Sequence, residues 1–285
     1  MRDVTASIDA EMALSRRRPG FAARLWRRVS APAFWRGVVA IVAFFALWHV
    51  AASSGLKGIG QIPTPLQVIT TFIEKYAGNL QFWSAWKVSF ARVVYGFLIA
   101  QVLGIPLGIL LGTNRLFRAM VYPVIELLRP IPPLAWVPLS ILFWPTTEMS
   151  IVFITTIGAF FIIVINVYEG VRQIPERYFW LASSLGARRR HMFWRILLPS
   201  IAPSITTGMV LGIAVTWNVL IAAEMIAGDT GLGRLTWEGY VSGSPAVVVI
   251  GMISIGLAGY LSTAVVYAIE RRLTPWGKGR KTDGR

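Results

Sequence analysis

Six apolar runs, each close to the length that crosses a lipid bilayer, constrain the fold more than any other feature of the sequence. They cover residues 35–54, 93–112, 119–143, 149–167, 201–223 and 246–269. An α-helix rises 1.5 Å per residue, so about 20 mostly apolar residues span the hydrocarbon core of a membrane. The sequence therefore predicts an all-α polytopic membrane protein with six transmembrane helices.

The composition agrees with a lipid environment. Hydrophobic residues make up 55% of the chain and charged residues 14%, with a mean hydropathy of +0.60, whereas a soluble domain is roughly 25% charged. The net charge of +15 does not indicate nucleic-acid binding, because the basic residues lie between apolar runs rather than along a polar domain. The absence of cysteine excludes disulfides, thiol catalysis and cysteine metal sites.

The distribution of Lys and Arg predicts the orientation. Of the 28 basic residues, 22 lie in two terminal tails and the loops that share their side, and four lie in loops on the opposite side. Cytoplasmic loops are enriched in Lys and Arg, so both termini are predicted to be cytoplasmic. Residues 1–34 and 270–285 would form basic tails around a transmembrane domain of residues 35–269. The first tail is interpreted as retained, because no small-residue cleavage site follows the first run.

Two regions between and within the runs have distinctive patterns. Residues 62–90 are amphipathic and predict a helix that begins at Pro65 and lies along the outer membrane surface. The third run contains four prolines together with Glu126 and Arg129. It is predicted to be kinked and packed inside the bundle, and the two charged residues are close enough on one helix face to form an ion pair.

Glycines at intervals of four residues form a ridge in the second run, at Gly104, Gly108 and Gly112. Such a ridge allows two helices to approach closely. Packing within the chain and packing at a dimer seam are both compatible with the pattern, and we favour packing within the chain.

The loop between the fourth and fifth runs, residues 169–200, is longer than a helical bundle requires. Its pattern predicts a helix over residues 176–184, a turn at Gly186, and a second helix over residues 187–198 that stops before Pro199. These elements would form a knuckle in the cytoplasm, apolar on one side and cationic on the other. On charge alone, a basic loop that only fixes orientation is equally consistent.

This loop resembles the cytoplasmic loop of permeases from binding-protein-dependent ABC importers. The family pattern is E-A-A, three residues, G, nine residues and I-x-L-P, and the matching positions hold Ala182, Gly186, Ile196, Leu198 and Pro199. Trp180 and Leu181 replace the family's glutamate and first alanine. Other stretches resemble the nitrate, sulfonate, taurine and bicarbonate uptake permeases, in the same order along the chain. They are IPTPLQV from Ile62, RVVYGFLIAQVLGIPLGILLG from Arg92, LRPIPPLAWVPLSILFW from Leu128, EMSIVFITTIGAFFIIVINVYEGV from Glu148 and AAEMIAGDTGLGRL from Ala222.

The resemblance implies a type I ABC importer of the bacterial inner membrane. Two copies of the chain, two ATPase subunits and an external substrate-binding protein would together import a small solute such as nitrate, a sulfonate or taurine. ATP and Mg²⁺ would bind the ATPase subunits, and this chain, which lacks a P-loop motif, would hold no cofactor or metal. The knuckle would be the ATPase-coupling loop. Its predicted residues are Trp180, Leu181, Ala182, Leu185, Gly186, Ala187, Arg188, Arg189, Arg190, Ile196, Leu198 and Pro199.

Polar side chains inside apolar runs are costly in lipid and usually face a bundle interior or a water-filled cavity. The predicted pathway candidates are Asn166, Trp217, Asn218 and Glu224. For the two asparagines, an interhelical hydrogen bond is the favoured alternative. For Glu224, a solvated carboxylate at the outer membrane surface is equally consistent.

The main alternative function is a self-sufficient secondary transporter or channel. Such proteins are expected to contain inverted repeats, interrupted helices or ionisable residues near the middle of a span, and no inverted repeat is evident in this sequence. A membrane-embedded enzyme would need convergent titratable groups, but the two histidines, His49 and His191, lie in different compartments. We therefore expect no catalysis within this chain.

Overall fold

The computed structural model describes residues 32–54 and 62–274, and helices are the only regular elements in these ranges. The predicted tails therefore lie almost entirely outside the described residues. The chain divides into two compact units, Met1–Leu66 and Gln67–Arg285. In the first unit, α3 (Pro32–Ser53) is an apolar helix, and Trp48 donates a hydrogen bond from Nε1 to the Pro63 carbonyl oxygen at 3.0 Å. At the boundary of the units, α4 (Pro65–Lys75) begins at the predicted proline.

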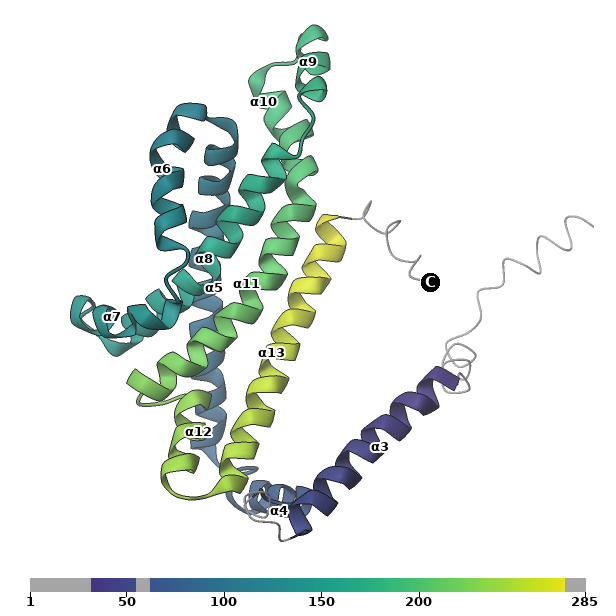
Figure 1. Ribbon diagram of the computed structural model, residues 1–285, viewed down its shortest axis with the longest axis vertical. Helices are drawn as coiled ribbons and strands as arrows, with labels where there is room; N and C mark the ends of the chain where they lie inside the picture. Colours follow the sequence, from purple (N-terminus) through teal and green to yellow (C-terminus); the bar gives the residue numbers. More distant parts are fainter. Residues whose placement is uncertain (1–31, 55–61, 275–285) are drawn as a thin grey trace, which may run out of the picture. The chain divides into compact units, whose positions relative to one another are not determined.

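The second unit is a bundle of long helices joined by short ones (Figure 1). The long helices are α5 (Leu80–Thr113), α8 (Thr147–Arg172), α11 (Leu198–Ala227) and α13 (Pro245–Leu273). The shorter elements are α6 (Arg115–Leu128), η1 (Pro133–Trp136), α7 (Val137–Phe143), α9 (Glu176–Ser184), α10 (Arg189–Met192), the π-helical η2 (Phe193–Leu197) and α12 (Leu232–Val241). Together these elements confirm the predicted all-α class.

Helix α8 is the centre of the second unit, since it packs against both α5 and α11 (Figure 1). Its residues Ile151, Ile154 and Ile163 are fully buried. Burying each of these side chains stabilises the fold by about 1.5–3 kcal/mol where the reference state is water. In lipid, that term is replaced largely by van der Waals packing, which demands close helix contact.

The glycine ridge of α5 provides that contact. Gly104, Gly108 and Gly112 face Ile163, Val167 and Val171 of α8, and a Cβ added at Gly108 would lie 2.7 Å from the Cβ of Val167. The prediction that the ridge packs within the chain is therefore confirmed. About two turns earlier on the same helix, Gly96 makes the same close approach to Thr155.

Five helices of the described residues are long and apolar enough to cross a membrane, or six if one bent pair counts as a single span. The bent pair is the predicted third span, in which α6 and the η1–α7 segment meet at 90°. Prolines at positions 130, 132 and 133 remove backbone donors there, so the helix breaks instead of kinking.

The prediction that the third span packs inside the bundle is wrong for this chain taken alone. One face of α7 packs against α8, where Val137 and Ser140 are buried, but the opposite face is open and Leu142 is 85% exposed. The predicted ion pair between Glu126 and Arg129 is also absent from the part of the chain that the structure describes. Both residues are exposed, and Arg129 instead lines a cavity.

The predicted surface helix over residues 62–90 is two elements rather than one. The chain turns after α4, and α5 starts at Leu80, well before the predicted start of the second span. Asn79 sets this boundary, because its side chain accepts a hydrogen bond from the Gln81 backbone N–H at 2.8 Å. Asparagine is among the strongest N-cap residues, so the sequence did contain the signal for this break.

Candidate functional site

The knuckle predicted from the sequence projects beyond the ends of the neighbouring helices (Figure 1). Helix α9 covers the predicted residues and ends in a Schellman motif, in which Gly186 N–H donates to Ser183 O at 3.0 Å and Ala187 N–H donates to Ala182 O at 2.9 Å. Gly186 has a φ of +74°. Glycine adopts this conformation without the steric cost that a Cβ imposes, which explains the turn.

The second half of the knuckle differs from the prediction. The helix that begins at Arg189 does not stop before Pro199 but continues through it into α11. Proline lacks an N–H and normally disrupts the preceding turn. Here that turn is π-helical, and Leu198 N–H donates to Phe193 O. The wider turn accommodates Pro199, so the knuckle is joined to α11 by unbroken helix.

The tip of the knuckle presents apolar side chains next to arginines. Trp180 and Leu181 are exposed, and Leu185 is 87% exposed. Arg188, Arg189 and Arg190 follow on the exposed surface. The other predicted residues are half-buried: Ala182 and Ala187 lie in the turn, and Ile196, Leu198 and Pro199 lie where the knuckle joins α11. Exposed apolar side chains grouped in this way mark surfaces that bind another protein or a membrane.

A buried charge network lies at the opposite end of the bundle, where α5, α8, α11 and α12 meet. Arg92 of α5 donates from Nη1 to Glu224 Oε1 of α11 at 2.8 Å and from Nε to Glu148 Oε2 of α8 at 2.9 Å. Its Nη2 also pairs with Glu148. Arg92 is 3% exposed and Glu224 is fully buried. One guanidinium therefore joins three long helices.

The network also holds the start of α12. Ser89 Oγ donates to Glu224 Oε1 at 2.8 Å and accepts from Leu232 N–H at 2.8 Å, while Gly233 N–H donates to Glu224 Oε2 at 2.9 Å. The first N–H groups of a helix have no partner inside that helix, and a carboxylate is favourable beside them. Gly231, with a φ of +128°, brings the chain close enough for these bonds.

Glu224 is completely buried and paired with Arg92, so the alternative of a solvated carboxylate at the outer membrane surface is wrong. Its partners Arg92 and Ser89 are not predicted from the sequence. The sequence does contain one signal for this pairing, which is Arg92. An arginine within an apolar stretch needs a carboxylate in the same bundle. Of the neighbouring acids, Glu238 forms an exposed ion pair with Arg234 at 2.9 Å, and Asp229 is exposed.

The structure does not bring the four predicted pathway candidates together. Trp217 is buried and donates from Nε1 to Ser262 Oγ of α13 at 3.1 Å. Asn218 lies on an exposed face of α11. Asn166 donates from Nδ2 to Ile162 O of its own helix at 2.8 Å, so the interhelical bond suggested for it is not formed by the described residues. Only Asn166 lines one of the two larger cavities.

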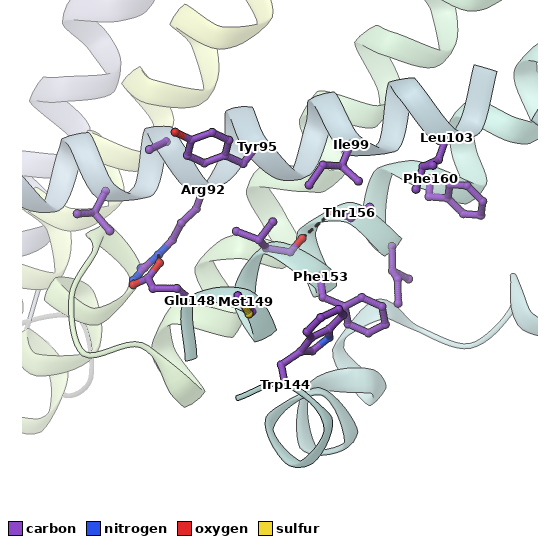
Figure 2. A pocket seen from close by; sticks show the side chains of 14 residues that line it. Arg92, Tyr95, Ile99, Leu103, Trp144, Glu148, Met149, Phe153, Thr156 and Phe160 are labelled. Carbon is purple, nitrogen blue, oxygen red and sulfur yellow. Dashed lines mark hydrogen bonds and ion pairs between the residues drawn. The ribbon is translucent and has the colours of Figure 1, made fainter. Parts of the chain in front are cut away.

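The larger cavity, about 850 Å³, lies between α5 and α8 (Figure 2). Figure 2 shows Arg92 and Glu148 pointing toward each other at one end, and Trp144 packed against Phe153 with ring centroids 5.6 Å apart. Tyr95, Ile99 and other mainly apolar side chains form the walls. The ion pair is already satisfied, so this cavity offers apolar surface rather than reactive groups.

Across residues 32–54 and 62–274, no group of three or more His, Asp or Glu side chains is placed to hold a metal ion. Taken together, the apolar helices and the exposed knuckle define a multi-pass membrane protein with a surface suited to binding a partner.

Comparisons with known proteins identify the family. The family described as binding-protein-dependent transport system inner membrane component matches residues 104–276. The chain is 34% identical to the nitrate import permease protein of Leptolyngbya laminosa, over 84% of this chain and 88% of that protein. It is 31% identical to the taurine transport system permease protein of Escherichia coli, over 84% of this chain and 88% of that protein. The chain therefore belongs to this family and is a permease subunit of an ABC importer, embedded in the inner membrane by several passes.

Two further similarities agree with this assignment. The bicarbonate transport system permease protein of Synechococcus elongatus is 33% identical over 81% of this chain and 86% of its own length. Among solved structures, a chain of the MetNI methionine ABC transporter in an inward-facing conformation matches 66% of this chain and 96% of its own length, with a TM-score of 0.54 and 19% identity. The second similarity confirms the predicted type I importer fold.

Proposed function

We propose that two copies of this chain form a translocation pathway for a small anion such as nitrate, taurine or another sulfonate. An external substrate-binding protein would deliver the anion, and two separate ATPase subunits would drive transport with ATP and Mg²⁺. This chain itself would contain no cofactor. The names of the nitrate, taurine and bicarbonate relatives support the substrate class, and the positive charge of both tails supports cytoplasmic termini.

The observation that carries this proposal is the geometry of the knuckle. The Schellman turn at Gly186 holds α9 against the helix that follows, with Leu185 fully presented at the tip. The second helix is continuous with α11, which runs the length of the bundle. A force applied to the tip by a partner would therefore reach the transmembrane core through one helix. The arginines beside the tip suit an acidic surface on an ATPase subunit, although anionic lipid would attract them as well.

Replacing Leu185 with Asp tests the docking surface. The side chain is exposed, so the fold should tolerate the change, but a charge at an apolar contact should abolish docking. We expect the L185D variant to insert normally and to lose its ATPase subunit during purification. Leu80, which is 85% exposed in the first turn of α5, supplies the matched control L80D, which should keep the subunit.

Two outcomes would contradict the proposal. The first is co-purification of the L185D variant with the ATPase at the wild-type ratio. The second is uptake of nitrate or taurine by the purified chain alone in vesicles, without an ATPase or a binding protein. That result would favour the self-sufficient transporter.

A further inference from the structure

The second cavity, about 560 Å³, lies at the bend between α6 and η1, against α8 and α11. On α8 its lining runs from Ile157, about 15 Å along the helix from its start, to Asn166. On α11 it includes Leu211 and Val215, which lie in the middle of that helix. The cavity therefore lies near the middle of two helices that are long and apolar enough to cross the membrane.

Among the described residues, Arg129 is the only charged one that lines this cavity. Its side chain forms no hydrogen bond or ion pair with any residue in the described part of the chain. Arg92 of α5 provides the contrast, because Glu148 and Glu224 neutralise its charge. A guanidinium without a carboxylate at this depth is costly, and such groups usually face a water-filled path.

Asn166 adds a second unengaged polar group to the same cavity. One of its N–H groups donates to Ile162 O, which leaves the other N–H and the side-chain oxygen without a partner among the described residues. The walls between Asn166 and Arg129 are mainly apolar, including Ile131 and Ile157. A charge in apolar surroundings acts more strongly on a ligand than it would in water.

We infer that Arg129 and Asn166 form a transient binding subsite for a small oxyanion on its way through the bundle. The planar guanidinium offers several N–H donors in a fork that matches two oxygen atoms of a carboxylate, nitrate or sulfonate. The amide N–H of Asn166 supplies a further donor. No carboxylate is found among the described residues of the cavity lining, which disfavours cations. This inference rests on the proposed import of an anion. It adds a site within this chain at which the anion binds during transport.

The first test uses bromide as a probe of the anion site. Crystals of the complex with its ATPase subunits are soaked in bromide, and anomalous scattering locates the ion. We expect a peak beside residue 129 in the wild type and in the control variant R115Q, which makes the same change at an exposed position of α6. The peak should be absent from R129Q. A wild-type complex without the peak, or an R129Q complex that retains it, would overturn the subsite.

The second test measures uptake of nitrate, bicarbonate and taurine in vesicles that contain the complex and its binding protein. Losing a charge-assisted hydrogen bond should lower the uptake rate of R129Q about tenfold or more, with R129K less affected and R115Q unchanged. Wild-type uptake by R129Q, with the complex intact, would contradict the inference. If the wild-type complex imports none of these anions, the proposed substrate class fails, whereas the bromide experiment still decides whether the subsite exists.

Discussion

Arg92 and Glu224 form a buried ion pair at 2.8 Å although they are 132 positions apart in the sequence. The pair joins the first long helix of the second unit to α11, the helix that continues from the knuckle. Both charges are almost completely removed from solvent, whereas Glu148, the second partner of Arg92, is 60% exposed. The two halves of the network should therefore differ in what they contribute to stability.

Replacing Arg92 with Gln should be strongly destabilising. The variant leaves Glu224 buried without a counter-charge, and breaking a buried pair in this way costs about 3–5 kcal/mol. E148Q should cost less, because that carboxylate is largely solvated. The measurement is thermal unfolding of the purified protein in detergent. E238Q provides a control, since it removes an exposed pair worth at most about 1 kcal/mol. Equal unfolding temperatures for R92Q and E238Q would contradict the role given to the network.

Gly233, in the first turn of α12, should not tolerate replacement even by alanine. A Cβ on Gly233 would lie 2.5 Å from the Ile221 carbonyl oxygen and 2.8 Å from the Cβ of Glu224, so G233A must displace α12 and weaken the bond from its N–H to Glu224. We expect a lower unfolding temperature. Gly256 of α13 is the control, because its Cβ would meet no atom within 4 Å. G256A should be neutral or stabilising by up to about 1 kcal/mol.

Features set by neighbouring residues could be predicted from the sequence, and features set by helix packing could not. The start of α4 at Pro65, the bounds of α9 and the turn at Gly186 follow from local capping and turn preferences. The course of the chain through Pro199 depends on a π-helical turn with no sequence signal that we can identify. The partner of Arg92 depends on which helices are neighbours, and the apolar pattern alone does not specify that.

The glycine ridge of α5 should show a graded response to alanine. At Gly104 the added Cβ would meet the Ile163 side chain at 3.0 Å, and a side chain can adjust. At Gly108 it would also meet the Val164 backbone oxygen at 2.8 Å, and backbone cannot move without shifting α8. Overpacking typically costs about 1–3 kcal/mol, so we expect G108A to lower the unfolding temperature more than G104A does. The reverse order would show that the ridge does not set the approach of the two helices.

Gly186 can be tested against a glycine in the same local geometry. Gly243, between α12 and α13, has a φ of +64° and an equivalent Schellman motif, in which Ser244 N–H donates to Gly239 O at 2.9 Å. A Cβ at either glycine would meet no atom within 4 Å. Valine at either site should therefore impose a similar backbone cost, of about 1–2 kcal/mol, and the two variants should insert and unfold alike.

Their effects on transport should differ, because only Gly186 shapes the proposed ATPase-docking surface. We expect G186V to lower both uptake and substrate-stimulated ATP hydrolysis in the reconstituted complex, while G243V retains both. The paired comparison separates loss of coupling from loss of stability, since the strain is matched. If G186V retains uptake and stimulated hydrolysis, the knuckle does not couple this chain to the ATPase. If both variants lose transport equally, backbone strain rather than the docking surface explains the effect.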